Sequence, residues 1–373
     1  MNVAFLNENM LGHSSYLPRF AAALERRPEL GIHPVRVDAL PLPPHLKRWG
    51  DTSIRGLRRF GLDFHALRWR SAASRNIREQ LDRIRVRQPI DALVVNTQSV
   101  GLKLGELPVQ IPTFVGLDAT FRQLADSPWM GQNAAARFLQ PITLSALRRA
   151  ERRLFQTATR LLPWSGNAAK SLAADYGIDR ARIHVLPPSM EVPARRSVRE
   201  RPLRPRLLFV GGDFSRKGGP LLLECHRRHL ADRCDLDVVT ETDVPAAPGL
   251  RVHRGVTAGS EAWRHRWNTA DVFVFPSRLE TFGIVLLEAL AFEVPIVSSN
   301  AGAAETILGS GAYGKLLPEL TVEALRVAVT DVLEAPAAAA ERARLGRQSF
   351  EEKYNLQTNT ALLAKWLREA VTG

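Results

Sequence analysis

The chain has 373 residues, 45% of them hydrophobic and 24% charged, which is enough to bury two cores and excludes a disordered or fibrous protein. Its 51 Lys and Arg residues exceed its 38 Asp and Glu residues, and the net charge of +13 favours anionic partners such as phosphates, nucleic acid or an acidic membrane face. Two cysteines, Cys225 and Cys234, exclude a disulfide framework and a cysteine zinc site, so we expect two reduced thiols.

The first residues, MNVAFLNENM, have neither the basic start nor the long apolar stretch of a signal peptide. No run of about 18 apolar residues occurs anywhere, which argues against a membrane-spanning helix. Residues 3–6 are better interpreted as a first buried strand. We therefore expect a cytoplasmic protein, with peripheral attachment to the inner membrane face as the alternative.

Short apolar runs alternate with longer amphipathic stretches in the first half of the chain. Buried strands are predicted at 3–6, 92–95, 113–115 and 160–163, and helices at 16–24 and 146–155. Such alternation is typical of a doubly wound α/β sheet.

Residues 187–206 interrupt this rhythm with five prolines and six arginines, which disfavour both regular structure and burial. The alternation then resumes. Strands are predicted at 207–210, 236–239, 272–275 and 296–298, and helices at 220–230, 283–292, 322–333 and 358–371. We predict an α/β fold with two Rossmann-like doubly wound domains, residues 1–192 and 207–355, joined by a linker at 193–206. Residues 356–373 form a C-terminal helix.

The strongest functional signal is the run PSRLETFGIVLLEAL at 276–290, between a predicted strand and a helix that begins near Phe282 and Gly283. Free N–H groups at a helix N-terminus bind anions. Glu280 lies in the preceding loop, and Glu288 lies on an apolar stretch of the helix. Two solvated carboxylates would be the ordinary interpretation of this spacing. The apolar flanks of Glu288 instead favour a functional or paired group, and a carboxylate can accept hydrogen bonds from the neighbouring hydroxyls of a sugar or ribose.

A second signal is LFVGGDFSRKGG at 208–219, a strand followed by a glycine turn and then by basic residues. Gly211 and Gly212 would let the backbone approach a ligand, and Arg216 and Lys217 would neutralise phosphate charge. Taken alone, the glycines are equally consistent with a plain tight turn.

Glu280 and Glu288 together look like the E-x7-E signature of glycosyltransferase family 4. The next predicted strand, PIVS at 295–298, is followed by Gly302 and Glu305, as is usual in that family. The resemblance covers most of the chain and is specific over about 205–317. It implies the GT-B architecture, in which two Rossmann-like domains face each other across a cleft and the C-terminal helix 356–373 packs back on the first domain.

The resemblance also implies an activity: retaining, metal-independent transfer of a hexose-type sugar from a nucleoside-diphosphate sugar to a glycan, glycolipid or other hydroxyl acceptor. No cofactor and no metal site are expected. By the same resemblance, Lys217 and Arg216 hold the donor diphosphate, Glu288 binds the ribose hydroxyls and Glu280 lies near the transferred sugar. The remaining donor-site candidates surround these residues in the two motifs: Gly211, Gly212, Thr281, Phe282, Gly283 and Ile284.

The first half offers two further catalytic candidates. His13 lies in a predicted loop at 7–16, where a histidine without a direct role would simply be solvated. Asp118 follows a predicted strand at a point where many family members have histidine. The alternative to a catalytic role is that Asp118 caps a helix or lies in a turn. Gly212 also departs from the family, because many members have arginine at this position, and Arg216 could replace that guanidinium.

Residues 45–87 are strongly basic, with 12 Lys and Arg against 4 Asp and Glu. Leu57, Phe60, Phe64 and Leu67 recur at roughly helical spacing within this segment. One interpretation is a basic amphipathic helix that contacts an anionic membrane surface and a lipid-linked acceptor. The other is a helix packed on the first sheet with a solvated basic face.

Two other classes of function are consistent with parts of the sequence. One is a catalytically silent GT-B-fold binding protein, against which the intact Lys217, Glu280 and Glu288 argue. The other is a basic nucleic-acid-binding protein, but the chain has no aromatic-interleaved basic motif or helix-turn-helix signature, so no nucleic-acid partner is expected.

Overall fold

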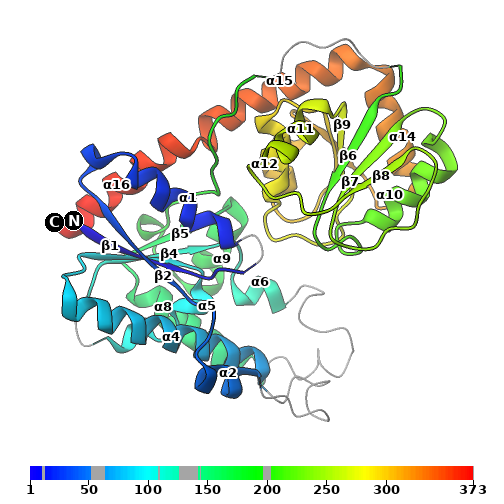
Figure 1. The fold of residues 1–373 in the computed structure, drawn as a ribbon. Helices are drawn as coiled ribbons and strands as arrows, with labels where there is room; N and C mark the ends of the chain where they lie inside the picture. Colours follow the sequence, from blue (N-terminus) through cyan, green and yellow to red (C-terminus); the bar gives the residue numbers. More distant parts are fainter. Residues whose placement is uncertain are drawn as a thin grey trace. The chain divides into compact units, whose positions relative to one another are not determined.

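The computed structural model describes residues 1–10, 13–51, 64–107, 110–125, 142, 144–195 and 203–372. The chain divides into two compact units, Met1–Met190 with Leu356–Gly373, and Glu191–Asn355. Each unit contains one parallel β-sheet with its own helices (Figure 1). The predicted α/β fold with two doubly wound domains is confirmed, and the arrangement of the two domains across a cleft stays a prediction.

The first unit contains a five-stranded parallel sheet with the strand order β2-β1-β3-β4-β5. Its strands are β1 (Asn2–Asn7), β2 (His33–Asp38), β3 (Ala92–Asn96), β4 (Thr113–Leu117) and β5 (Arg160–Pro163). Its helices are α1 (His13–Glu25), α2 (Pro44–Asp51), α4 (His65–Arg87), α5 (Gln98–Gly101), α6 (Phe121–Ala125), α8 (Ser145–Thr157), α9 (Gly166–Tyr176) and α16 (Leu356–Thr372).

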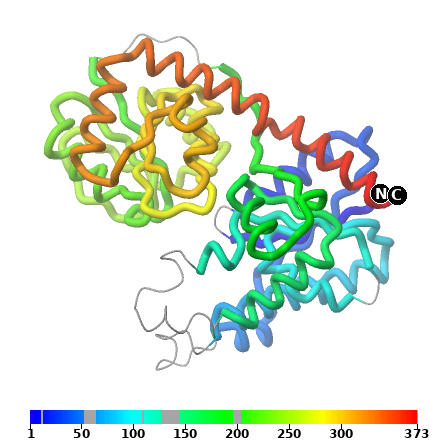
Figure 2. The backbone as a smooth tube through the Cα atoms, turned by 180° about the vertical axis from the view of Figure 1, so that it is seen from behind, coloured from blue at the N-terminus to red at the C-terminus, as the bar shows by residue number. Residues whose placement is uncertain are grey.

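Helices cover both faces of this sheet, which explains why its strands are continuous apolar runs rather than alternating ones. Ala4 and Leu6 of β1 belong to one core with Ile77 of α4, whereas Val3 and Phe5 point to the opposite face and are equally buried. The C-terminal helix α16 packs against α1 within this unit, and the two helices run side by side in both views (Figure 2).

The second unit contains a six-stranded parallel sheet with the strand order β11-β10-β9-β6-β7-β8. Its strands are β6 (Arg206–Val210), β7 (Asp235–Val239), β8 (Leu250–His253), β9 (Val272–Phe275), β10 (Ile296–Ser299) and β11 (Lys315–Leu317). Its helices are α10 (Gly219–Cys225), α11 (Glu261–Thr269), α12 (Ile284–Ala291), α13 (Ala304–Ile307), α14 (Val322–Glu334) and α15 (Pro336–Lys353). Cys225 and Cys234 are free and buried, and burial raises the pKa of each thiol to about 12.

Each sheet has a point where the strand order changes direction. In the first sheet this point lies between β1 and β3, and in the second it lies between β6 and β9. Open α/β sheets bind ligands outside the carboxyl ends of the strands at such a point. The topology therefore directs attention to the residues that follow β1 and β3 in the first unit, and β6 and β9 in the second.

Several local predictions are corrected. The predicted loop at 7–16 is wrong from His13 onward, because α1 already begins there. The predicted helix at 220–230 consists of α10 followed by a short π-helix at His226–Leu230. Of the predicted linker at 193–206, residues 196–202 lie outside the described residues.

The basic segment 45–87 is also partly outside the described residues, which exclude 52–63 and therefore Leu57 and Phe60. Phe64 has a left-handed φ of 49°, so no regular helix runs through it into α4. Leu67 packs against the small core of Phe121, Leu144 and Leu147, as in the packed-helix interpretation. None of the helices in the described part of the chain combines the length and apolar character needed to span a membrane.

Candidate active site

The second unit brings Lys217 and Glu280 into contact at its topological switch point. Lys217 lies in the loop after β6, and Glu280 lies in the loop after β9. The Lys217 ammonium donates to Glu280 Oε1 and lies 5.1 Å from the centre of the Phe275 ring. Both side chains are mostly shielded from solvent, at 16% and 7% exposure. Burial lowers the pKa of Lys217, and the adjacent Glu280 carboxylate opposes that shift.

Arg216 reaches the same carboxylate from a more exposed position. Its Nη1 donates to the Leu279 carbonyl at 2.8 Å and lies 3.5 Å from Glu280 Oε1. Its Nε lies 3.3 Å from Asp213 Oδ2. These contacts hold the guanidinium beside Glu280, and its compensation for the arginine missing at Gly212 stays a prediction.

Glu280 is fixed through one of its two carboxylate oxygens. Oε1 accepts from Lys217, Arg216 and the Ser277 hydroxyl, the last at 2.9 Å. No residue in the described part of the chain donates to Oε2. The side chain is thus oriented by three donors and retains an acceptor for a ligand hydroxyl.

Glycines hold the loops of this site close together. Gly218 has φ +80°, and a Cβ there would lie 1.8 Å from the Pro276 carbonyl oxygen. Gly302, with φ +65°, packs so closely on Glu280 that a Cβ would lie 2.8 Å from the Glu280 Cβ. Gly211 closes against the Lys217 stem, with 3.0 Å from an added Cβ to Lys217 Cγ. Gly212 by contrast faces open space, with nothing within 4 Å of an added Cβ.

The predicted helix mouth is formed at α12. Gly283 caps the helix with φ 103°, and Ile284 begins it. Thr281 is half-buried and Phe282 is buried, with the Phe282 carbonyl accepting from Ala303 N–H at 3.2 Å. The first N–H groups of α12 have no carbonyl partner within the helix, so this end is chemically suited to an anion.

Glu288 lies within α12 and is only 7% exposed. Its Oε2 accepts from the indole N–H of Trp263, which belongs to α11, at 3.2 Å. The ring of Trp263 in turn packs edge-on against Phe292. The sequence predicted that Glu288 would be functional or paired, but it gave no signal for the indole partner 25 residues earlier.

The first unit joins the other two predicted catalytic residues. His13 begins α1, Asp118 follows β4, and His13 Nε2 lies 3.3 Å from Asp118 Oδ2. The His13 ring also packs on Trp164 at 4.9 Å between centres, and Asn96 at the end of β3 donates to the His13 carbonyl at 3.3 Å. The third predicted catalytic residue, Glu280, belongs to the second unit. Within the first unit, the structure brings His13 and Asp118 together.

This pair has an electrostatic consequence. Burial lowers the pKa of His13, but Asp118 and Glu8 outweigh burial and raise it to about 9. Because the folded-state pKa lies above the ordinary 6.5, the pair stabilises the fold fully below pH 6.5, and this contribution is lost as the pH rises through about 9. Each pKa unit corresponds to about 1.4 kcal/mol, so the contribution is on the order of 3 kcal/mol.

We expect Asp118→Asn to return the His13 pKa to 6.5 or below, because burial then acts without its main opposing charge. Imidazole chemical shifts followed against pH measure this directly. Asp82→Asn, on the solvent side of α4, is the matched control and leaves the titration unchanged. An unshifted His13 titration in Asp118→Asn would contradict the pairing.

In the described part of the chain, no group of three or more His, Cys, Asp or Glu side chains is placed to hold a metal ion. The cations at the second unit's switch point are instead the side chains of Arg216 and Lys217. This arrangement can neutralise a diphosphate with protein groups, while Glu280 and Glu288 offer acceptors for hydroxyls.

Comparison with known proteins agrees with this geometry. Residues 251–352, which include Glu280 and Glu288, match the family model for glycosyl transferases group 1. The D-inositol 3-phosphate glycosyltransferase of Geodermatophilus obscurus is 32% identical over 196 residues, which cover 45% of this chain and 44% of that protein. Its namesake from Paenarthrobacter aurescens is 28% identical over 254 residues, or 60% of each chain. The chain thus spans about half the length of the curated relatives it matches.

Among solved structures, sucrose-phosphate synthase from Thermosynechococcus elongatus superposes with a TM-score of 0.70 at 17% identity, over 99% of this chain and 98% of that one. At this identity the likeness shows the fold alone, which is the GT-B fold. The match to the group 1 glycosyltransferase model lies in the second unit, and the likeness of fold extends over the whole chain. The resemblance to glycosyltransferase family 4 inferred from the E-x7-E signature is confirmed.

Proposed function

We propose that the protein is a retaining glycosyltransferase that moves a hexose-type sugar from a nucleoside-diphosphate sugar to a hydroxyl of a glycan or glycolipid, without a metal ion. The observation that carries the proposal is the contact of Lys217 and Arg216 with Glu280 at the switch point between β6 and β9. Two cations and the mouth of α12 suit a diphosphate, and a carboxylate fixed beside them suits the hydroxyls of the attached sugar.

The chemistry requires charge stabilisation rather than a protein nucleophile. The bond between the anomeric carbon and the diphosphate oxygen breaks, and a new bond forms from the acceptor hydroxyl oxygen on the same face of the sugar. The hydroxyl proton passes to the departing phosphate oxygen. Lys217 and Arg216 stabilise the negative charge that develops on the leaving group, while Glu280 orients the sugar through Oε2. For the first unit, we propose that the pair of His13 and Asp118 binds a substrate hydroxyl group.

The activity is tested by mixing the full-length protein with a panel of nucleotide sugars and hydroxyl acceptors and measuring released nucleoside diphosphate. We expect release with one nucleotide family, an anomeric configuration in the product that matches the donor, and the same rate with or without EDTA. A clear loss of turnover in EDTA would overturn the metal-independent mechanism. An inverted product would overturn retention.

Glu288→Gln is expected to weaken nucleoside-diphosphate binding about 10- to 100-fold, since a hydrogen bond to a charged group contributes about 1.5–3 kcal/mol. The physical reason is that the ribose hydroxyls lose a carboxylate acceptor. The amide oxygen can still accept from the Trp263 indole, so the melting temperature should change little. Glu224→Gln, an exposed residue of α10, is the control. A lower melting temperature with unchanged nucleotide affinity would assign Glu288 a structural role only.

A further inference from the structure

A second cationic site lies in the first unit. It is a cavity of about 290 Å³ between α6, α8 and the end of α9, and we call it the arginine pocket. Its charged lining is four arginines and one aspartate: Arg122, Arg148, Arg149, Arg152 and Asp175. A water molecule occupies about 30 Å³ in the liquid, so the pocket has room for a phosphoryl group with part of its ester.

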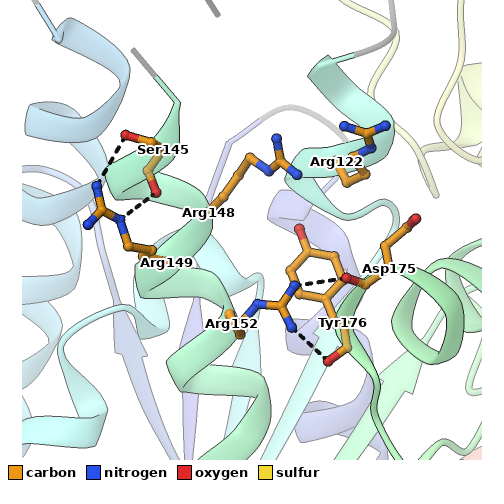
Figure 3. A pocket seen from close by; sticks show the side chains of 7 residues that line it. All are labelled: Arg122, Ser145, Arg148, Arg149, Arg152, Asp175 and Tyr176. Carbon is orange, nitrogen blue, oxygen red and sulfur yellow. Dashed lines mark hydrogen bonds between the residues drawn. The ribbon is translucent and has the colours of Figure 1, made fainter. Parts of the chain in front are cut away.

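Three of these arginines, Arg148, Arg149 and Arg152, form no ion pair with a carboxylate in the described part of the chain. The Arg148 side chain, in the first half of α8, makes no hydrogen bond or ion pair within the described ranges, and Figure 3 shows it extending towards the side where Arg122 of α6 lies. Arg149 turns back to Ser145 of its own helix, at 3.4 Å to both the carbonyl and the hydroxyl. The Asp175 carboxylate accepts from Ser171 at 2.6 Å.

Arg152 is positioned by neutral acceptors, which leaves its charge uncompensated. Its Nη1 donates to the Tyr176 carbonyl at 3.1 Å and its Nη2 to the Asp175 carbonyl at 2.9 Å (Figure 3). Its guanidinium carbon lies 5.2 Å from the centre of the Tyr176 ring. These contacts hold the guanidinium in place before any ligand arrives, which reduces the entropy lost on binding.

The nearby carboxylate of Glu151 is directed into the protein rather than into the pocket. It is fully buried, and its Oε1 accepts from Phe121 N–H at 2.8 Å and from Gln98 at 3.2 Å. Its Oε2 accepts from the Tyr176 hydroxyl. Burial raises the pKa of Glu151 to about 7, so this group carries only part of a negative charge near neutral pH. It fixes Tyr176, which lines the pocket, without supplying a counter-ion on the pocket side.

We propose that the arginine pocket binds the phosphoryl group of a ligand, through Arg148 and Arg122 together with the preoriented Arg152. Guanidinium groups recognise phosphate oxygens with paired N–H donors, and several of them converging on one small cavity suit a dianion better than a single carboxylate. The ligand is either a small phosphorylated molecule or the headgroup of an anionic lipid. The proposal does not depend on sugar transfer in the second unit.

The test uses full-length protein carrying Lys217→Ala, so that phosphate binding at the second unit's switch point is weakened. Inorganic phosphate is titrated calorimetrically at low ionic strength into this variant and into derivatives that also carry Arg148→Gln, Arg122→Gln or Arg153→Ala. Arg153 lies on α8 and is exposed, but it does not line the pocket, so it is the matched control. Melting temperatures confirm that each variant is folded.

We expect Arg148→Gln and Arg122→Gln each to weaken phosphate binding about 10- to 100-fold, because a charged hydrogen-bond donor is lost, and Arg153→Ala to have no effect. Absence of phosphate binding in the Lys217→Ala parent, or equal affinity in the Arg148→Gln derivative, would overturn the proposal. Because nucleoside diphosphates test the second unit and inorganic phosphate tests this pocket, failure of one leaves the other intact.

Co-sedimentation with vesicles distinguishes the two ligand sources. Vesicles of phosphatidylcholine are compared with vesicles that also contain phosphatidylglycerol. Binding to the anionic vesicles that requires Arg148 but not Arg153 assigns the pocket to a lipid headgroup. Phosphate binding without vesicle binding assigns it to a small phosphorylated molecule. If the Arg148 and Arg153 variants lost vesicle binding and phosphate binding equally, general surface charge would account for both kinds of binding. That result would contradict a specific site.

Discussion

Replacement of Lys217 by alanine is expected to lower kcat/KM for sugar transfer by about 10²- to 10³-fold, the range seen when one preorganised donor to a developing oxyanion is removed. Lys217 supplies a compact positive charge in a largely dehydrated position between Phe275 and Glu280. At such a position the charge interacts more strongly with a departing diphosphate than it would in water. The rate of nucleoside-diphosphate release, measured at saturating and limiting donor, separates the loss in kcat from the loss in KM.

Two companion variants sharpen this expectation. Lys170→Ala, on α9 of the first unit, removes a lysine outside the site and should leave kcat/KM unchanged. The double variant Lys217→Ala with Glu280→Gln removes the cation together with the buried carboxylate it neutralises. It should restore the melting temperature lost in Lys217→Ala, but not the activity, because the leaving group still lacks its cation. Activity of Lys217→Ala within threefold of the parent would refute the assigned role.

Gly218→Ala is expected to have the largest effect on the fold of the second unit. The added Cβ would lie 1.8 Å from the Pro276 carbonyl oxygen, and φ +80° is unfavourable for any residue with a Cβ. Overpacking and backbone strain each contribute about 1–3 kcal/mol, so we expect a loss of about 3 kcal/mol or more. At roughly 2–4 °C per kcal/mol, the transition of this unit should fall by about 6–12 °C.

The matched control for this variant is Gly212→Ala in the same loop. Gly212 has nothing within 4 Å of an added Cβ and does not adopt the left-handed conformation, so alanine fits without displacing any neighbour. Scanning calorimetry of both variants measures the difference. An unaltered transition in Gly218→Ala would mean that the loops after β6 and β9 do not approach as closely as described.

The fold was predictable because its strands are buried on both faces and therefore read as uninterrupted apolar runs between amphipathic stretches. Residues 272–275 and 296–298, for example, are predicted strands and correspond to β9 and β10. Helix ends were less predictable. The start of α1 at His13 lies beside residues that contain no strong start signal, and no local pattern in the sequence marks the π-helix after Cys225.

The candidate site was predictable only where its residues belong to one continuous motif. Lys217 and Glu280 were both singled out, but their contact spans 63 positions and depends on β6 and β9 being neighbours in the sheet. Ser277, which orients Glu280, lies within the run at 276–290, but Trp263, which contacts Glu288, lies outside both motifs and has no pattern of its own in the sequence. The basic residues of α8 can be read directly from the sequence. That they line one pocket together with Arg122 is known only once the fold is known.

The most direct test of the account is an equilibrium titration of the purified protein with UDP, GDP, ADP and dTDP, with and without Mg²⁺. The account predicts that one of these nucleotides binds, that Mg²⁺ leaves its affinity unchanged, and that Lys217→Ala and Glu288→Gln each weaken it while Arg153→Ala does not. If none of the four nucleotides binds, or if binding survives both substitutions unchanged, the second unit does not hold a nucleotide-sugar donor in the way described.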